Sequence, residues 1–426
     1  MNNWAKIIIG DCRIMKEVEN ESIDLIVTSP PYWHIKDYGI PGQIGYGQSL
    51  HEYLKDLYYV WSESFRVLRK GGRLCINIGD QFARSIIYGR YRVIPLHGEF
   101  IAQCEKIGFD FMGSIIWQKK TTMNTTGGAT VMGSFPYPSN GIVEIDYEFI
   151  HIFKKPGKGK KVSKEIKEAS KLSKEEWKEY FSGHWYFGGA KQIGHEAMFP
   201  DELPRRLIRM FTFIEDTVLD PFLGSGTTVK VALELQRNAI GYEINEEFLE
   251  IIKEKLNIKE SLFKLNNVQI IKGKEKITTL PLIDYIPRIQ DAKPQIDPKK
   301  FNFKGDRLYK VIQIVDENTI KLNTGLNVKF LGVKIDKKDE TIRYLKDYIL
   351  GKNIFLKFQN DKVVNENTVM AYVYLKNKIF INSYLIKSGL GSPDFSINHK
   401  LRDKFIKLWK ERERVGQGID TEYGNK

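Results

Sequence analysis

Short apolar runs alternate with amphipathic stretches through the first two-thirds of the chain. Strands are predicted for the apolar runs at residues 6–9, 23–28, 73–78, 112–118, 147–153, 217–219 and 239–243. Helical spacing of apolar positions predicts helices over 50–68, 94–107, 203–213 and 227–235. Several runs are apolar throughout, which is typical of strands covered on both faces of a sheet. The alternation predicts an α/β domain with seven strands in a mostly parallel sheet and helices on both faces.

Two insertions interrupt this pattern. Residues 119–140 are rich in Thr, Gly, Met and aromatic residues and are predicted to form a long loop. The second insertion covers about 156–190, and its first part, 156–183, carries eight Lys and five Glu. Such a charged run is either a solvated helix face or a surface that follows a phosphate backbone.

A second β-rich unit follows a proline-containing stretch. Over 266–303 the periodicity fades and four prolines occur, which predicts a linker, part of it packed on a domain. Beyond it, strands are predicted over 309–322, 328–335, 353–358 and 369–381, with helices over 341–350, 382–388 and 400–414. We therefore expect a first domain over 1–265 and a second over 304–420.

Composition and charge favour a soluble protein with a polyanionic partner. The chain has 426 residues, which suits two or three domains of about 150 residues each. Lys and Arg number 66 against 53 Asp and Glu, and residues 301–426 hold 24 basic and 15 acidic side chains, so most of the surplus lies in the second unit. Nucleic acid is the simplest polyanion to fit this surplus.

Several classes of protein are disfavoured. The three cysteines, Cys12, Cys75 and Cys104, lie far apart and are expected to be buried, inert thiols rather than disulfides or metal ligands. The N-terminus lacks the charged and apolar regions of a signal peptide, and no apolar run approaches the ~20 residues that span a bilayer. We expect a cytoplasmic protein with no membrane partner and no metal.

The first chemical motif is Thr28-Ser29-Pro30-Pro31-Tyr32, directly after a predicted strand. The two prolines restrict the backbone, so the segment leaves the strand in a rigid, extended shape. That shape can hold the Ser29 hydroxyl and the Pro30 carbonyl as fixed acceptors for an amino group, while Tyr32 offers a ring for stacking. An ordinary proline turn after a strand is the alternative.

The second motif is a glycine-rich loop between a strand and a helix. Its residues are Asp220-Pro221-Phe222-Leu223-Gly224-Ser225-Gly226-Thr227-Thr228. The glycines let the backbone approach a ligand, and the helix N-terminus offers N–H groups to an anion such as a carboxylate. It is not a phosphate-binding P-loop, because the Gly-Lys-Ser/Thr ending is absent. Glu243 ends the next strand, where a carboxylate would hold ribose hydroxyls, unless it is simply a surface acid.

Together these motifs resemble the DNA methyltransferases that methylate exocyclic amines. The match covers about residues 5–260, and the catalytic motif precedes the cofactor loop, as in the permuted β class. The resemblance implies S-adenosyl-L-methionine as cofactor and a Rossmann-like sheet of seven strands with helices on both faces. It also implies a set of cofactor-binding positions, namely Asp11, Thr28, His195, Phe199, Asp220, Pro221, Phe222, Gly224, Ser225, Gly226, Thr227 and Glu243.

Within this set, the resemblance places Asp11 near the adenine and Glu243 at the ribose. His195 and Phe199 fall where the family has the helix that closes the methionine pocket, although His195 could equally be a polar residue at a helix start. The catalytic residues implied are Ser29, Pro30, Pro31 and Tyr32.

The implied reaction needs no covalent enzyme intermediate. Ser29 and Pro30 would accept the two N–H bonds of the target amine and localise its lone pair for in-line attack on the sulfonium methyl. The base must leave the duplex to reach them, and would stack on Tyr32. The Pro-Cys nucleophile of ring-carbon methyltransferases is missing. Ser29 is similar to the cytosine-N4 enzymes, whereas adenine-N6 enzymes more often carry Asp or Asn there, so adenine-N6 is the alternative.

The resemblance also assigns target recognition to the two insertions. Lys119, Asn124 and Thr125 are expected to contact bases or phosphates of double-stranded DNA. A lid over the cofactor is the alternative for the loop. A restriction–modification system with a cognate endonuclease would be the setting, and a non-catalytic DNA-binding protein is the rival from another class.

The second unit resembles the staphylococcal nuclease-like domain, an OB-type β-barrel with helices. The resemblance covers about residues 305–420, but the active-site positions depart from it. The calcium-site segment is Asp316-Glu317-Asn318-Thr319, the first catalytic arginine position is Lys329, and Thr368 stands at the second. The family's Asp-Thr-Pro-Glu is replaced by Lys334-Ile335-Asp336-Lys337. We therefore expect a barrel without nuclease activity that either retains DNA binding or is a structural appendage; a bifunctional methyltransferase–nuclease is the remaining alternative.

Overall fold

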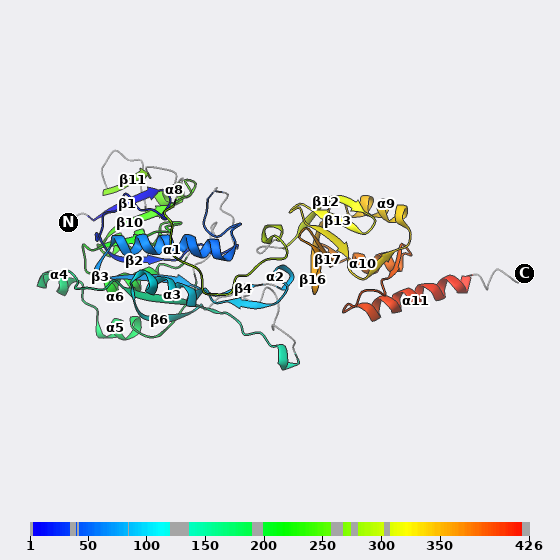
Figure 1. The fold of residues 1–426 in the computed structure, drawn as a ribbon, viewed down its shortest axis with the longest axis horizontal. Helices are drawn as coiled ribbons and strands as arrows, with labels where there is room; N and C mark the ends of the chain where they lie inside the picture. The colour runs from blue at the N-terminus through cyan, green and yellow to red at the C-terminus, as the bar shows by residue number, and fades with distance from the viewer. Residues whose placement is uncertain are drawn as a thin grey trace, which may run out of the picture. The chain divides into compact units, whose positions relative to one another are not determined.

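The computed structural model describes residues 3–34, 40, 42–83, 85–119, 136–189, 199–256, 267–273, 280–301 and 307–419. The chain forms two compact units, each considered by itself (Figure 1). Unit 1 comprises Met1–Gln81 and Ile94–Asp291, and unit 2 comprises Phe82–Val93 and Ala292–Lys426. Among the helices within these ranges, none is long and apolar enough to cross a membrane.

Unit 1 is built on a nine-stranded sheet with the order β11-β1-β10-β9-β2-β3-β7-β6-β8. The strands are β1 (Trp4–Ile9), β2 (Ile23–Thr28), β3 (Leu68–Ile78), β6 (Asp110–Lys119), β7 (Tyr147–Lys154), β8 (His184–Phe187), β9 (Thr217–Asp220), β10 (Asn238–Glu243) and β11 (Asn267–Lys272). All neighbouring pairs in this order are parallel except the two that involve β7. The sheet is therefore mostly parallel, as predicted.

The predicted count of seven strands is wrong, because β8 and β11 were missed. β8 has four residues inside a lysine-rich insertion, and its strand conformation depends on parallel pairing with β6. β11 lies where the apolar periodicity fades and pairs with β1 at the edge of the sheet. Both strands owe their existence to a partner far away in sequence, which local periodicity does not record.

Helices cover both faces of the sheet. On one face, α6 (Glu202–Phe211) and α7 (Thr227–Glu234) pack on a core that includes Ile7, Leu25 and Val27. On the other, α1 (Leu50–Val67) and α3 (Leu96–Ile107) pack together. On their side of the sheet, the ring of Phe65 packs against that of Phe109. Phe109 in turn packs against Phe153 of β7.

The lysine-rich insertion lies away from the carboxyl ends of the strands. Lys160 forms ion pairs with Asp24, at 3.0 Å, and with Asp216, and these acids stand at the amino ends of β2 and β9. Ser170 Oγ accepts a hydrogen bond from the Ile214 N–H at 2.9 Å, at the same edge. Because both chemical motifs follow carboxyl ends, residues 160–170 lie at the other end of the strands from them, and DNA reading by the insertion stays a prediction.

Part of the stretch over 266–303, which was predicted as a linker partly packed on a domain, packs on unit 1. After β11, the stretch around Tyr285 packs on α3, where the buried Tyr285 hydroxyl hydrogen-bonds to Glu99. Glu99 also accepts from the backbone N–H groups of Arg288, at 3.1 Å, and Ile289, at 2.9 Å. These residues are therefore part of unit 1, since a buried carboxylate satisfied by their backbone fixes their course.

Unit 2 contains a closed five-stranded barrel with the strand order β12-β13-β14-β17-β16. Its elements are β12 (Tyr309–Asp316), β13 (Thr319–Leu322), β14 (Asn327–Phe330), β15 (Val333–Ile335), α9 (Lys338–Tyr348), β16 (Asn353–Asn365), β17 (Thr368–Leu375), α10 (Ile381–Lys387), β18 (Gly391–Pro393) and α11 (Arg402–Ile419). β15 and β18 pair separately.

A segment from the first half of the chain completes the core of unit 2. Residues 82–93 include α2 (Ser85–Tyr88), whose Ile86 and Ile87 are buried in the barrel's hydrophobic core. The Ile87 carbonyl accepts a hydrogen bond of 2.5 Å from the Gln295 N–H. The barrel core therefore takes residues from two distant parts of the chain, which the predicted boundaries at 304–420 did not include.

Candidate active site

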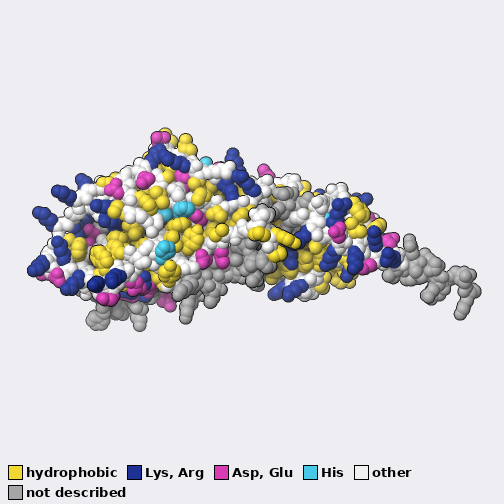
Figure 2. Space-filling model, turned by 90° about the horizontal axis from the view of Figure 1, so that it is seen from below, with side chains coloured by type: hydrophobic (Ala, Val, Ile, Leu, Met, Phe, Trp, Pro, Cys, Tyr) yellow, Lys and Arg dark blue, Asp and Glu magenta, His cyan; other side chains and the backbone are white. Residues whose placement is uncertain are grey.

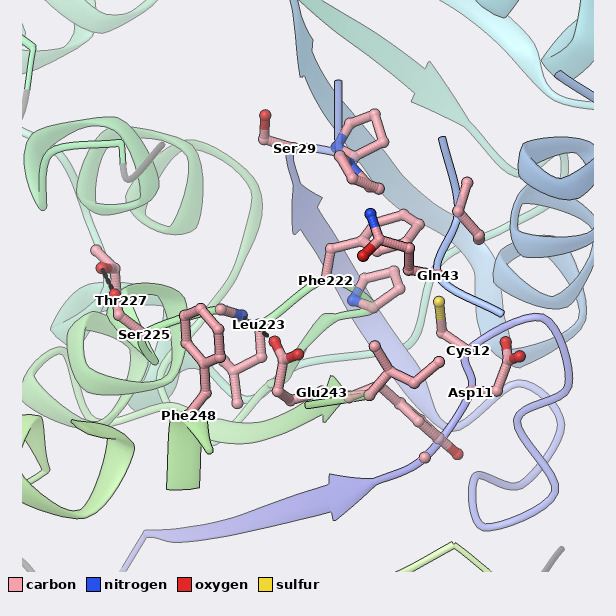
Figure 3. A pocket seen from close by; sticks show the side chains of 18 of the residues that line it. Asp11, Cys12, Ser29, Gln43, Phe222, Leu223, Ser225, Thr227, Glu243 and Phe248 are labelled. Atoms are coloured by element: carbon pink, nitrogen blue, oxygen red, sulfur yellow. Dashed lines mark hydrogen bonds between the residues drawn. The ribbon is translucent and has the colours of Figure 1, made fainter. Parts of the chain in front are cut away.

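A pocket opens at the carboxyl ends of β1, β2, β9 and β10, which are adjacent in the sheet (Figure 3). Its empty volume is about 1090 Å³, part of it open to solvent, which is the size of a cofactor site. The two predicted motifs meet here although they are almost two hundred residues apart. All four predicted catalytic residues, Ser29, Pro30, Pro31 and Tyr32, line the pocket.

The predicted cofactor-binding residues divide into three groups. Those that line the pocket are Asp11, Phe199, Pro221, Phe222, Gly224, Ser225, Thr227 and Glu243. Three others, Thr28, Asp220 and Gly226, are not in the lining. His195 lies outside the described residues, as do Asn124 and Thr125 of the predicted DNA contacts, while Lys119 is the last residue of β6.

The Ser-Pro-Pro-Tyr segment is held from both sides. Tyr53 of α1 donates a hydrogen bond to the Pro31 carbonyl at 2.9 Å. The Tyr32 hydroxyl donates to Glu148 Oε1 at 2.5 Å, and Asn77 Nδ2 donates to Glu148 Oε2 at 2.7 Å. Burial and the neighbouring Glu148 carboxylate raise the pKa of Tyr32. The ring of Tyr32 is thereby fixed in orientation, so the segment is more than an ordinary proline turn.

Glu148 is a residue that sequence reasoning missed. It stands in β7, within a run predicted only as an apolar strand, and it is buried. The signal that was available is its charge, because a carboxylate inside a buried strand needs partners and those partners often form a site.

Asp220 joins the two motifs from behind the pocket. Its Oδ1 accepts hydrogen bonds from Thr28 Oγ1 at 2.7 Å and from the Phe222 N–H at 3.0 Å, and its Oδ2 accepts from Thr228 Oγ1 at 2.6 Å. The predicted direct contact of Thr28 and Asp220 with the cofactor is therefore corrected to a positioning role, since their polar groups are turned toward each other. Burial raises the pKa of Asp220 to about 6.

The glycine loop has the conformation that its sequence predicts. Gly224 and Gly226 have φ angles of 54° and 90°, in the left-handed region that glycine tolerates, and Gly226 caps the start of α7. Glu243 supports the loop, because its Oε2 accepts from the Gly224 N–H and its Oε1 from the Asn245 N–H, both at 2.9 Å. Glu243 lines the pocket and is not a solvated surface acid.

Asp11 is locked in place by an arginine. Arg13 Nε donates to Asp11 Oδ2 at 3.0 Å, and Arg13 Nη1 donates to Asp56 at 2.7 Å. Cys12, beside Asp11, is buried and free, as are Cys75 and Cys104, and burial raises the pKa of each thiol. Among the described residues, no group of three or more His, Cys, Asp or Glu is placed to hold a metal ion.

The pocket has two distinct ends. Figure 3 shows Ser225 and Thr227 at one end, Asp11 and Cys12 at the other, and Glu243 between them. Hydroxyl donors at a helix N-terminus suit an anion, and a carboxylate at the end of the adjacent strand suits ribose hydroxyls. The lining thus fits an elongated nucleoside with a charged tail, and Ser29, directly after β2, lines the same pocket.

Comparison with known proteins agrees with this geometry. The family model described as DNA methylase matches residues 23–254. The type II methyltransferase M.MjaI of Methanocaldococcus jannaschii is 42% identical, over 62% of this chain and 96% of its own length. The type II methyltransferase M.MthZI of Methanothermobacter thermautotrophicus is 32% identical, over 80% of this chain and 98% of its own. The chain therefore belongs to the N6/N4 DNA methylase family.

A solved structure shows the same relationship for the fold. A protein from Thermus thermophilus, described as a putative DNA modification methylase and complexed with S-adenosyl-L-methionine, is 34% identical with a TM-score of 0.50. The match covers 63% of this chain and 99% of that one.

Proposed function

We propose that the protein is a type II DNA methyltransferase of a restriction–modification system that methylates the exocyclic N4 amine of a cytosine in double-stranded DNA. The methyl donor is S-adenosyl-L-methionine, in keeping with the family. The single observation that carries the proposal is the pocket, in which the Ser-Pro-Pro-Tyr segment faces the glycine loop.

The lining fits the cofactor from end to end. Glu243 would accept the ribose hydroxyls, and the end at Asp11 would take the adenine. Phe222 and Phe248 supply flat apolar walls beside Glu243 (Figure 3). S-adenosyl-L-methionine, when bound, supplies an electrophilic methyl group on a sulfonium; the remaining requirements fall on the residues of the chain.

The catalytic task of this chain is to orient a poor nucleophile. The lone pair of the cytosine amine is delocalised into its ring. Ser29 Oγ and the Pro30 carbonyl would accept its two N–H bonds and hold the nitrogen in line with the methyl group. Tyr32, fixed by Glu148, would stack on the base once it has left the duplex.

Ser29 favours cytosine-N4 over adenine-N6. The direct test is mass spectrometry of nucleosides from DNA incubated with the protein and S-adenosyl-L-methionine. We expect N4-methylcytosine. N6-methyladenine would keep the mechanism and overturn the assignment of the base, and DNA binding without any methylated base would favour a non-catalytic DNA-binding protein.

Cofactor binding should depend on pH through Glu243. Burial raises the pKa of its carboxyl from 4.5 to about 7. The protonated form has one acceptor fewer for the ribose, so we expect affinity for S-adenosyl-L-methionine to fall as pH decreases through about 7. Calorimetry at pH values on either side of the pKa measures this. Glu243→Gln should bind weakly at every pH, without the inflection; a wild-type affinity that does not change with pH contradicts the prediction.

For unit 2 we propose a staphylococcal nuclease-like OB barrel that binds DNA without cutting it. The closed five-stranded barrel supports this assignment. The former active-site positions have structural partners: Asn318 Oδ1 accepts from the Phe330 N–H at 3.2 Å, and Glu317 pairs with Lys338 at 2.9 Å. Lys and Arg side chains are spread over the visible face of this unit in Figure 2.

A group of exposed lysines provides the test for this barrel. Lys310, Lys352 and Lys376 surround Asn353, because Lys310 is paired with Asn353 between strands and the Lys376 N–H bonds to the Asn353 carbonyl at 3.0 Å. Replacing all three lysines with Gln should weaken DNA binding and reduce the slope of log K against log salt by up to about 2.7.

The matched control replaces Lys161, Lys164 and Lys167 of unit 1. These lysines are exposed and belong to the insertion that is anchored at the amino ends of β2 and β9, away from the pocket. Equal effects of the two triple variants, or none from the barrel variant, would make unit 2 a structural appendage. Plasmid cutting that requires calcium or magnesium would instead support the bifunctional alternative.

A further inference from the structure

Lys255 lies behind the polar end of the pocket, outside both sequence motifs. It is the last residue of α8 (Phe248–Lys255). Its Nζ donates hydrogen bonds to Ser225 Oγ at 2.7 Å and to Thr227 Oγ1 at 2.8 Å. Both hydroxyl groups belong to buried residues that line the pocket, whereas Lys255 is not in the lining.

Lys255 lies among charged side chains of both signs. The nearby carboxylate of Asp201 is paired with Lys230 at 2.6 Å. Burial is the largest influence on Lys255 and lowers its pKa, with Lys230 acting in the same direction and Asp201 opposing it. A buried ammonium group is stabilised by hydrogen-bond acceptors and anions within reach.

The hydrogen-bond chemistry points the same way. An ammonium group only donates, so the Ser225 and Thr227 oxygens act as acceptors toward Lys255. Ser225 Oγ and Thr227 Oγ1 lie 3.4 Å apart and share a hydrogen bond in which either can donate, so at least one hydroxyl proton can be donated into the pocket. The first N–H groups of α7, which begins at Thr227, have no partner within the helix and contribute a positive potential at the same end.

We propose that Lys255, acting through Ser225 and Thr227, makes this end of the pocket a site for the carboxylate of the cofactor and selects ligands that carry one. The inference rests on the cofactor orientation proposed above. Lys255 is a positioning residue: it polarises and orients two hydroxyl donors, and these contact the ligand.

The test compares two ligands that differ only in the carboxylate. Calorimetry on the full-length protein measures the Kd of S-adenosyl-L-methionine and of its decarboxylated analogue. We expect wild type to prefer the carboxylate form. Lys255→Met should weaken binding of S-adenosyl-L-methionine by about tenfold to a hundredfold, while the Kd of the decarboxylated analogue changes by less than about twofold. The preference should therefore largely disappear.

Two variants control the experiment. Lys253→Met, on the same helix, removes a lysine that pairs with Glu250 at 2.8 Å, and it should leave both Kd values unchanged. Lys255→Arg keeps the charge and should retain the preference for the carboxylate. If Lys255→Met does not fold, as judged by thermal unfolding, Lys255→Gln gives the same comparison.

The outcomes separate this inference from the proposed function. Equal weakening of both ligands by Lys255→Met would show a merely structural role, and unchanged binding would exclude any role; either overturns the inference. Wild type that binds the two ligands equally overturns the cofactor orientation as well. The identity of the methylated base is measured separately and stands in each of these cases.

Discussion

Replacing Ser29 with alanine should lower the rate of methyl transfer by about 100- to 1000-fold, the usual loss when a preorganised polar group is removed from the reacting centre. The variant loses one of two acceptors for the target amine, and the lone pair is then no longer held in line with the methyl group. Binding of S-adenosyl-L-methionine should change by less than about twofold, because the Ser29 hydroxyl is assigned to the target amine and makes no proposed contact with the cofactor.

Single-turnover kinetics and calorimetry measure the two effects. Ser22→Ala is the matched control, since Ser22 stands just before β2, at the opposite end of the strand from Ser29, and its hydroxyl donates to the Glu19 carbonyl. A normal rate in Ser29→Ala would remove Ser29 from the catalytic residues. Lost cofactor binding together with the lost rate would assign Ser29 to the cofactor site instead.

Replacing Asp220 with alanine should lower the free energy of unfolding by about 3 kcal/mol, because buried donors of Thr28, Phe222 and Thr228 lose their acceptor. Since Asp220 ties the end of β2 to the glycine loop, we also expect both cofactor affinity and turnover to fall. Asp220→Asn keeps the shape and one acceptor oxygen, so it should retain most of the stability. Urea unfolding of the three proteins measures the difference.

The Asp220 carboxyl group should also make the stability of the folded protein depend on pH. Burial raises its pKa from 3.8 to about 6, so the folded protein binds a proton more tightly than the unfolded chain. The stability that this proton contributes is fully present below the unfolded pKa and is lost as pH rises through about 6. In Asp220→Asn this contribution to the pH dependence should be absent. An equal decline of stability in wild type and Asp220→Asn would contradict the assignment.

Residues close together in sequence were predicted most accurately. The strand before Ser29 and the strand and helix around the glycine loop are set by short apolar runs, by prolines and by the left-handed conformation of Gly224 and Gly226. These causes act within a few residues, so the motifs and their chemistry could be predicted from them, and the pocket contains both.

Residues whose partners are remote were not predicted. Glu148 acts through Tyr32, which is 116 positions away, and Ile87 is buried among strands that begin after residue 300. The lysine-rich insertion carried a charge that suited DNA, but Lys160 is paired with Asp24 and Asp216 at the amino ends of the strands. The net charge of a segment indicates the charge that a binding partner would carry. It does not show whether a given lysine is already paired with a carboxylate of the same chain.

The sequence by itself determined an α/β domain followed by a β-rich unit, because strand–helix alternation and the local geometry of two motifs are properties of neighbouring residues; the methyltransferase class followed from the resemblance that these motifs carry. Only the tertiary structure decided how the polar groups are used. It turned Asp220 toward Thr28 and Thr228, joined Glu148 to Tyr32 and brought Lys255 to Ser225 and Thr227. Buried polar groups must find partners wherever packing supplies them, and packing joins residues that are distant in the chain.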